Sequence, residues 1–219
     1  MSAASAGLVS STESQTASIQ AHVDRAIEDV LATLPDPKQL STEQRRAIIA
    51  KYTAVLEGNF IYWMTGAYLA VGSDAARSKI RENLHEEVRD SHPAMLRKFA
   101  VAARAVPTAS DSEAVYGDLT NVRLFIGRLS PVPIVVTMAF FEGLIQRLMP
   151  YLAELAQHQG SSEMEYTDVH GVCDITHTQE LYRALEAELA LNPTPVSNGD
   201  MFEGVELLRS LVQTIVVNN

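Results

Sequence analysis

The apolar residues of the chain recur at helical spacing over almost its whole length. Positions three, four or seven apart share one face of an α-helix, whereas a half-buried β-strand shows alternating apolar and polar residues, and no stretch sustains that alternation. Ser41-Thr-Glu-Gln44 resembles a capping box, which marks the start of a helix. Pro93 can introduce a kink where it falls inside a helical stretch. The pattern predicts an all-α fold of seven helices, at about residues 18–34, 41–71, 75–105, 113–129, 131–159, 166–191 and 200–217.

Length and composition indicate one globular domain. The chain has 219 residues, of which 47% are hydrophobic and 20% charged, enough to bury a sizeable core. Residues 1–17 are rich in Ser, Ala and Thr and lack the basic start and apolar core of a signal peptide. We therefore expect a flexible tail at residues 1–17 and a single domain over residues 18–219. The longest apolar run, Pro131 to Ile145, is short for a membrane span and contains Glu142, so we expect a soluble, cytoplasmic protein.

Charge and cysteine content narrow the choice of partners. The formal net charge is -10, which argues against nucleic acid and anionic membranes. The single cysteine, Cys173, excludes an internal disulfide and fits a reducing compartment. On a helix Cys173 would point about 100° away from Asp174, so a buried thiol is the favoured interpretation.

The strongest chemical signal is the stretch His170-Gly-Val-Cys-Asp174-Ile-Thr-His177. On a helix, His170, Asp174 and His177 form one stripe of two imidazoles and a carboxylate. These groups suit iron, manganese or zinc, and with two imidazoles such a site usually needs carboxylates from other helices. A solvated helix face could show the same spacing by chance, so the interpretation depends on further ligands elsewhere in the chain.

Two glutamates stand among apolar residues on helix faces that should point toward the core. Glu142 stands in the apolar run from Val132 to Ile145, and a buried carboxylate needs either a partner or a metal. A metal is the favoured partner, and an ion pair with Arg123 or Arg128 is the alternative. Glu57 lies on an apolar edge of its predicted helix, with no charged residue after it until the helix ends, so it too should face inward.

The third predicted helix supplies the candidates Glu87 and His92. Both flank its apolar stripe, whereas Glu82 and Glu86 point away from it, and His85 is the reserve candidate. The sequence leaves open whether His85 or Glu86 replaces one of the two ligands. A spacing of five places Glu87 and His92 about 140° apart on a regular helix, so binding one centre requires a local distortion. Pro93 follows directly and can supply it.

The turn between the second and third predicted helices supports pairing Glu57 with Glu87. Glu57 lies 16 residues before Ser73 and Glu87 lies 14 residues after it. In an antiparallel pair of continuous helices the two carboxylates would therefore sit at nearly the same height. The predicted ligand set holds four carboxylates and three histidines: Glu57, Glu87, Glu142, Asp174, His92, His170 and His177.

Seven such ligands are too many for one tetrahedral zinc, and carboxylates with imidazoles inside a helical bundle are the usual environment of two irons. Their order along the chain resembles that of the heme-oxygenase-like di-iron oxidases, an iron-containing redox family. The resemblance spans about residues 57–177 and is most specific in the closing His-x-x-x-Asp-x-x-His. It implies a seven-helix heme-oxygenase-like fold whose ligands lie on the core helices.

The resemblance also implies roles for individual residues. Glu87 and His92 correspond to the first Glu and His of the family, Glu142 to its lone Glu, and the stretch from His170 to His177 to its closing triad. Glu57 matches in position an additional glutamate of N-oxygenating members. One departure is that the gap between Glu87 and His92 is shorter than in most members, which leaves this pair the least secure.

The implied chemistry is O2 activation. Two Fe(II) ions, with O2 as co-substrate and an external electron donor, form a peroxo species that oxidises a small molecule of natural-product metabolism. Glu57 as a seventh ligand favours N-oxygenation of an amine or amino-heterocycle to a hydroxylamine or nitro product. The alternative is oxidative C–C cleavage of a fatty or amino acid, which an apolar tunnel lined by Met138, Phe140 and Phe141 would favour.

Two further classes stay open. Some relatives of this fold contain no metal, and a non-enzymatic helical binding protein could also show inward acids. Either class would tolerate alanine at His170 or His177. No residue is assigned to substrate binding, and the sequence leaves the oligomeric state open, a homodimer included.

Overall fold

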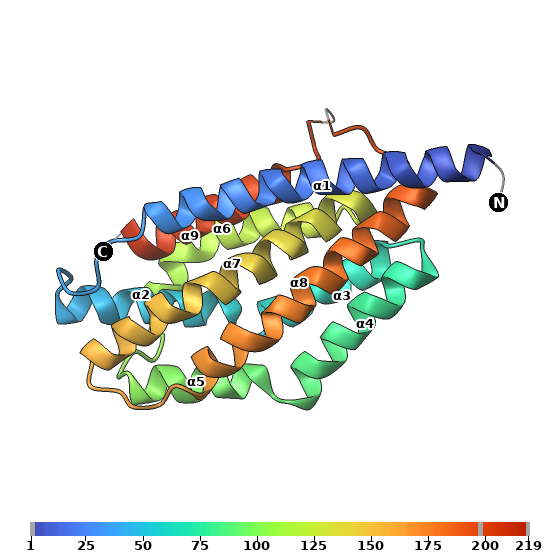
Figure 1. Cartoon of the computed structure of the whole chain (residues 1–219). Helices are drawn as coiled ribbons and strands as arrows, with labels where there is room; N and C mark the ends of the chain where they lie inside the picture. Colours follow the sequence, from blue (N-terminus) through green and yellow to red (C-terminus); the bar gives the residue numbers. More distant parts are fainter. Residues whose placement is uncertain (1–2, 197–198, 218–219) are drawn as a thin grey trace.

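The computed structural model describes residues 3–196 and 199–217, the first nine of them as backbone alone. Within these residues the protein consists of nine α-helices and no strand, which confirms the all-α prediction. The chain folds back on itself repeatedly, so that most helices run alongside a neighbour in one elongated bundle (Figure 1). The helices are α1 (Ala3–Ala32), α2 (Thr42–Leu56), α3 (Asn59–Ala70), α4 (Asp74–Arg89), α5 (His92–Ala102), α6 (Ala109–Ile126), α7 (Pro131–His158), α8 (Glu165–Leu191) and α9 (Glu203–Val217).

The number of helices exceeds seven because two predicted long helices are each broken. The stretch 41–71 is interrupted at Gly58, whose φ of 92° lies in the left-handed region that glycine adopts readily. The stretch 75–105 is interrupted at Ser91, which has a φ of 58°. Pro93 then stands in the first turn of α5, where its missing N–H leaves no helical hydrogen bond unmade. The local distortion expected at Pro93 is therefore a complete break between α4 and α5.

Residues 3–17, which belong to the stretch expected as a flexible tail at residues 1–17, form the first half of a helix. Helix α1 begins at Ala3, and alanine is the strongest helix former. From Thr16 onward the helix is anchored, because Thr16 is buried together with Ile19 and Val23. The side chain of Gln15 donates a hydrogen bond to the carbonyl oxygen of Thr194. The Ser, Ala and Thr composition alone did not reveal this packing.

Helix α7 forms the centre of the bundle. It packs most extensively on α8 and also contacts α1, α2, α3 and α9 (Figure 1). Every residue from Val132 to Ile145 is buried, Glu142 included, as the apolar run predicted. In the part of the chain described, α7 is the one helix long and apolar enough to cross a bilayer, and here it is covered by other helices.

Helix α8 carries the predicted ligand stripe into the interior. It lies against α7 on one side and against α4 and α5 on another. The break between α4 and α5 faces α8. Side chains from α4, α5, α7 and α8 can therefore meet next to the break. This arrangement sets the position of the site.

Candidate metal centre

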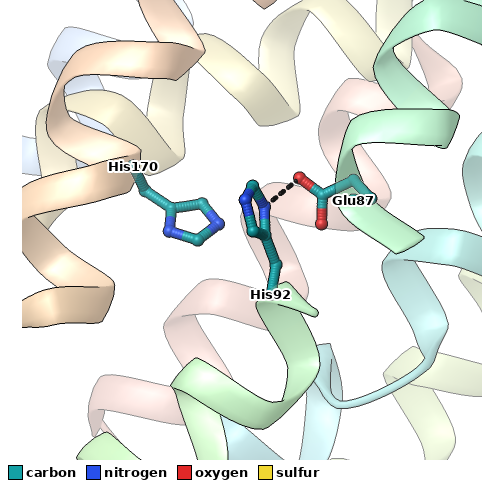
Figure 2. A group of neighbouring side chains, drawn as sticks. All are labelled: Glu87, His92 and His170. Atoms are coloured by element: carbon teal, nitrogen blue, oxygen red, sulfur yellow. Dashed lines mark hydrogen bonds and ion pairs between the residues drawn. The ribbon is translucent and has the colours of Figure 1, made fainter. Parts of the chain in front are cut away.

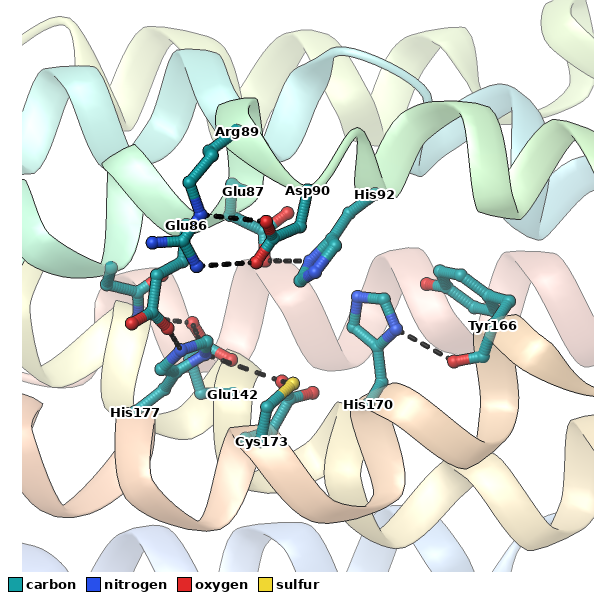
Figure 3. A network of polar contacts seen from close by, with 12 residues as sticks. Glu86, Glu87, Arg89, Asp90, His92, Glu142, Tyr166, His170, Cys173 and His177 are labelled. Atoms are coloured by element: carbon teal, nitrogen blue, oxygen red, sulfur yellow. Dashed lines mark hydrogen bonds and ion pairs between the residues drawn. The ribbon is translucent and has the colours of Figure 1, made fainter.

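Four helices bring six of the seven predicted ligands together in the interior (Figure 3). Each of the six side chains belongs to a residue that is 5% exposed or less, so the group is shielded from bulk water. Buried charged and imidazole side chains in such a cluster require partners. The six residues are Glu87 on α4, His92 on α5, Glu142 on α7, and His170, Asp174 and His177 on α8.

The first group consists of Glu87, His92 and His170 (Figure 2). Their ligand atoms lie within 4.8 Å of one another. The Nδ1 atom of His92 is 2.7 Å from Oε1 of Glu87, and the ring centroids of His92 and His170 are 4.5 Å apart. The helix is interrupted at Ser91, and this lets His92 turn back toward Glu87. The two side chains therefore meet although they would point about 140° apart on one regular helix.

The second group lies one to two turns further along α8. Cys173, Asp174 and His177 offer ligand atoms within 4.8 Å of one another. Glu142 borders this group, with its Oε1 atom 3.7 Å from Nδ1 of His177. The two groups border one narrow internal cavity, which Glu87, His92, Glu142, His170 and Asp174 all line. Two adjacent cation positions, with Glu142 beside the second, are therefore available.

Unpaired polar atoms in the second group fit a bound cation. Asp174 Oδ2 and His177 Nδ1 are buried and have no hydrogen-bond partner among the described residues. The Nδ1 atom of His177 is 3.5 Å from Asp174 Oδ1, too far for a hydrogen bond. A buried polar atom left without a partner costs about 1–3 kcal/mol, and coordination of one metal ion would satisfy both atoms.

Hydrogen bonds outside the cluster orient two of the imidazoles. His170 donates from Nδ1 to the backbone oxygen of Tyr166 at 2.8 Å, which leaves Nε2 for a metal. His177 donates from Nε2 to Oε2 of Glu86 at 2.9 Å, which leaves Nδ1 for a metal. Such partners fix the tautomer and the ring orientation of metal ligands.

Asn83 is a residue of the site that the sequence interpretation missed, and Glu86, which it left open as a replacement ligand, contacts the ligand His177. Glu86 was expected to point away from the core, and it is half-buried with its carboxylate on His177. Asn83 is buried and donates a hydrogen bond from Nδ2 to Oε1 of Glu142 at 2.7 Å. The signal for Asn83 was available, because it lies four residues before Glu87 and hence on the same helix face.

Burial, together with the neighbouring charges, shifts the pKa values of the site. Burial raises the pKa of Glu87 against the opposing hydrogen bond from His92. Burial and the charge of Glu142 raise the pKa of Asp174. Burial lowers the pKa of His170 to about 4, so this imidazole is neutral and its lone pair is available at neutral pH. A divalent cation would relieve the repulsion between the acids by replacing protons.

Glu57 is the predicted ligand that the structure places elsewhere. It follows the last residue of α2, and its carboxylate pairs with the guanidinium of Arg97, which is 71% exposed. Glu57 lines a separate surface pocket that also includes Gly58 and Tyr62. We predicted that Glu57 and Glu87 lie at the same height in the bundle, on the assumption of one continuous helix over residues 41–71. The break at Gly58 shows that this assumption was wrong.

The alternative partners named for Glu142 are also placed elsewhere. Arg123 donates to the side-chain oxygen of Asn59, and Arg128 pairs with Glu203. His85, the reserve candidate, is exposed and borders a different surface pocket. It therefore lies outside the cluster of buried ligands. The carboxylate of Glu142 thus faces the cavity and its histidines rather than an arginine.

Cys173 differs from its prediction in two respects. The thiol is half-buried, where a buried thiol was favoured, and it donates a hydrogen bond to Oδ1 of Asp174 at 3.1 Å. Burial and the neighbouring Asp174 raise the pKa of the thiol far above its usual value. Cys173 therefore contacts the second group instead of pointing away from it.

A family model supports the assignment of iron to this cavity. The model for iron-containing redox enzymes matches residues 49–209, which is most of the chain and includes both groups. The chain belongs to this family. As an iron-containing redox enzyme it has the heme-oxygenase-like fold expected from the resemblance, and the Glu, Asp and His side chains of the cavity are suitable iron ligands. A comparison with curated proteins found no match.

Proposed function

We propose that the protein is a non-heme di-iron oxygenase that uses O2 to oxidise a small organic molecule. The observation that carries the proposal is that two buried atoms, Asp174 Oδ2 and His177 Nδ1, have no hydrogen-bond partner among the described residues. They lie beside the group Glu87, His92 and His170. One group would hold each iron, and Glu142 is placed to contribute to the second. Because O2 reduction consumes electrons, the proposal includes an external electron donor.

Bound iron would supply the reduction of O2, and the chain supplies the surroundings. The apolar part of the cavity wall includes Leu56, Phe60 and Phe141, which exclude water and so strengthen electrostatic interactions inside. Tyr166 also lines the cavity, and its hydroxyl is 2.7 Å from that of Tyr52. Both tyrosines are buried, and burial raises their pKa values, so each hydroxyl holds its proton at neutral pH.

Two reactions remain candidates within this class. N-oxygenation of an amine or amino-heterocycle was predicted from Glu57 as a seventh ligand. With Glu57 paired to Arg97, that reaction is supported by the resemblance alone. Oxidative C–C cleavage of a fatty or amino acid gains one observation, since Phe141 lines the cavity as predicted for an apolar tunnel. Met138 and Phe140 are buried but do not line it.

The test is anaerobic loading with Fe(II), followed by mixing with O2 and stopped-flow absorbance. We expect two irons per chain and a transient visible band. Faster decay of the band with amines and an N-oxidised product would select N-oxygenation, whereas faster decay with aliphatic acids and a shortened product would select C–C cleavage. His170→Ala should abolish the band, and His85→Ala, at an exposed histidine outside the cavity, should retain it. Absence of iron uptake in the unaltered protein would contradict the proposal.

A further inference from the structure

Cys173 is the sulfur-containing member of the second group of ligands, and it is the single cysteine of the chain. On α8 it stands next to Asp174 and four residues before His177, so its side chain shares a helix face with His177 (Figure 3). The ligand atoms of the three residues lie within 4.8 Å of one another. A sulfur atom is therefore within reach of a cation held by Asp174 and His177.

The hydrogen bond of the thiol does not complete the polar contacts around it. The half-buried thiol donates to Oδ1 of Asp174 at 3.1 Å. A thiol is a weak donor, and a serine hydroxyl would serve the carboxylate better. The other oxygen of Asp174 and the Nδ1 atom of His177 are buried and have no hydrogen-bond partner among the described residues. One cation bound between the three side chains would satisfy these atoms together with the sulfur.

The sulfur makes the two cation positions chemically different. The first group offers one carboxylate and two imidazoles, from Glu87, His92 and His170. The second offers a carboxylate, an imidazole and a thiol, with the carboxylate of Glu142 at its border. Four protein ligands of sulfur, nitrogen and oxygen type suit a tetrahedral Zn(II). Thiolate ligands select such softer ions, whereas carboxylates also suit harder ions such as Mn(II).

We propose that Cys173 is a thiolate ligand of the second cation, together with Asp174 and His177, and that this position selects thiophilic divalent ions. When the sulfur–metal bond forms, the S–H bond breaks, its proton passes to water, and no electron is transferred. Zn(II) then competes with iron more strongly at the second position than at the first. This inference rests on the proposed function for the presence of two cation positions, and its test uses no O2.

The experiment is titration of the metal-free protein with Co(II) in the absence of O2, followed by absorption spectroscopy. A thiolate bound to Co(II) gives an intense charge-transfer band in the near ultraviolet, which carboxylate and imidazole ligands do not give. Because the chain contains a single cysteine, the band reports on Cys173 alone. We expect the band to grow with one of two bound Co(II) ions. Binding of Co(II) without the band would overturn the proposal and leave Cys173 as a hydrogen-bond donor to Asp174.

Three variants locate the contact between sulfur and metal. Cys173→Ser keeps a hydrogen-bond donor but removes the sulfur, so the band should disappear while Co(II) is still bound. His177→Ala should also lose the band, because it removes a ligand of the second position. His92→Ala is the matched control in the first group and should keep the band. A band that persists in His177→Ala, or that is lost in His92→Ala, would contradict the assignment. Thermal melting checks that all three variants are folded.

Competition with Zn(II) tests the selectivity of the second position. In the unaltered protein Zn(II) should remove the charge-transfer band before it displaces the other Co(II) ion. Cys173→Ser should bind Zn(II) at the second position at least about tenfold more weakly, since loss of an outer partner of a ligand alone costs that much. Equal Zn(II) affinity in Cys173→Ser and the unaltered protein would overturn the proposal.

The same protein separates this inference from the oxygenase function. A charge-transfer band with Co(II), in a protein whose Fe(II)-loaded form consumes no O2, would keep the thiolate ligand and reject the oxygenase. Uptake of two irons and consumption of O2, in a protein that gives no band with Co(II), would keep the oxygenase and reject Cys173 as a ligand.

Discussion

Asn83 donates a hydrogen bond from its side-chain amide to Glu142, with 2.7 Å between Nδ2 and Oε1. This contact joins α4 to α7 at the metal cavity and fixes the carboxylate of Glu142, the buried acid of the central helix. Both residues are buried, so water does not replace the contact if the amide is removed. Asn83 thereby holds Glu142 toward His177.

Asn83→Leu should weaken iron binding while the fold persists. Partners of metal-ligating carboxylates typically contribute tenfold to a hundredfold to metal affinity. We expect a loss in this range for the iron held by Asp174 and His177, measured by anaerobic titration with Fe(II). Asn121→Leu, at an exposed asparagine of α6, is the control and should bind iron normally. Normal affinity in Asn83→Leu would mean that Glu142 is positioned by the metal itself.

Glu86→Ala should have a related effect through His177. The Glu86 carboxylate accepts a hydrogen bond from Nε2 of His177, so its removal lets the ring rotate and change its tautomer. We expect at least tenfold weaker binding of one of two irons, with partial rescue in Glu86→Gln, whose amide oxygen can still accept the bond. Glu82→Ala is the control, since the Glu82 carboxylate contacts Ser78 on the exposed face. Equal iron affinity in Glu86→Ala and Glu82→Ala would exclude this positioning role.

Much of the site could be predicted from the sequence because its polar residues stand at helix positions that face the core and are usually apolar. An acid in an apolar helix, as at Glu142, must be given a partner, and the stripe from His170 to His177 follows from helix geometry alone. The partners of His177 and Glu142 depend instead on how α4 crosses α7 and α8. Periodicity within one helix contains no information on that crossing, so Glu86 was assigned to the wrong face.

The errors in the fold have a common cause. The break at Gly58 and the break at Ser91 are single-residue changes of backbone conformation inside otherwise helical sequences. Neither interrupts the apolar pattern, so two helices were each predicted as one. The first break displaced Glu57 from the predicted layer, whereas the second brought His92 to Glu87. The same pattern therefore led to one predicted ligand that lies outside the cluster and to a predicted pair whose side chains are in contact.

Glu57→Ala should leave the iron content unchanged. The Glu57 carboxylate pairs with Arg97 near the surface, and exposed ion pairs contribute about 0–1 kcal/mol to stability. We expect two irons per chain by metal analysis and a melting temperature close to that of the unaltered protein, with Arg97→Ala behaving alike. Loss of iron in Glu57→Ala but not in Arg97→Ala would restore Glu57 as a ligand and with it the structural argument for N-oxygenation.

Asp111 gives a pH-dependent contribution to stability far from the metal cavity. Its carboxylate accepts hydrogen bonds from Arg46 at 3.0 and 3.2 Å and caps α6 through Thr108. Burial alone would raise its pKa, but Arg46 and Thr108 outweigh burial and hold the pKa below the usual value of 3.8. A lowered pKa in the folded state means that the stabilisation is complete above the pKa of the unfolded state. It is lost as the pH falls through the lower folded-state value.

Asp111→Asn should therefore lower the melting temperature at neutral pH, and the difference from the unaltered protein should shrink as the pH falls below about 4. Weakening the capping box of α6 costs up to about 1 kcal/mol, and Arg46 also loses its charged partner. The measurement is thermal unfolding followed by circular dichroism from pH 7 to about pH 3 on metal-free protein, so that loss of iron in acid does not contribute. Asp168→Asn, at an exposed acid in the first turn of α8, is the control for a general charge effect. A difference between Asp111→Asn and the unaltered protein that stays constant with pH would show that the ionised carboxylate is not the stabilising form.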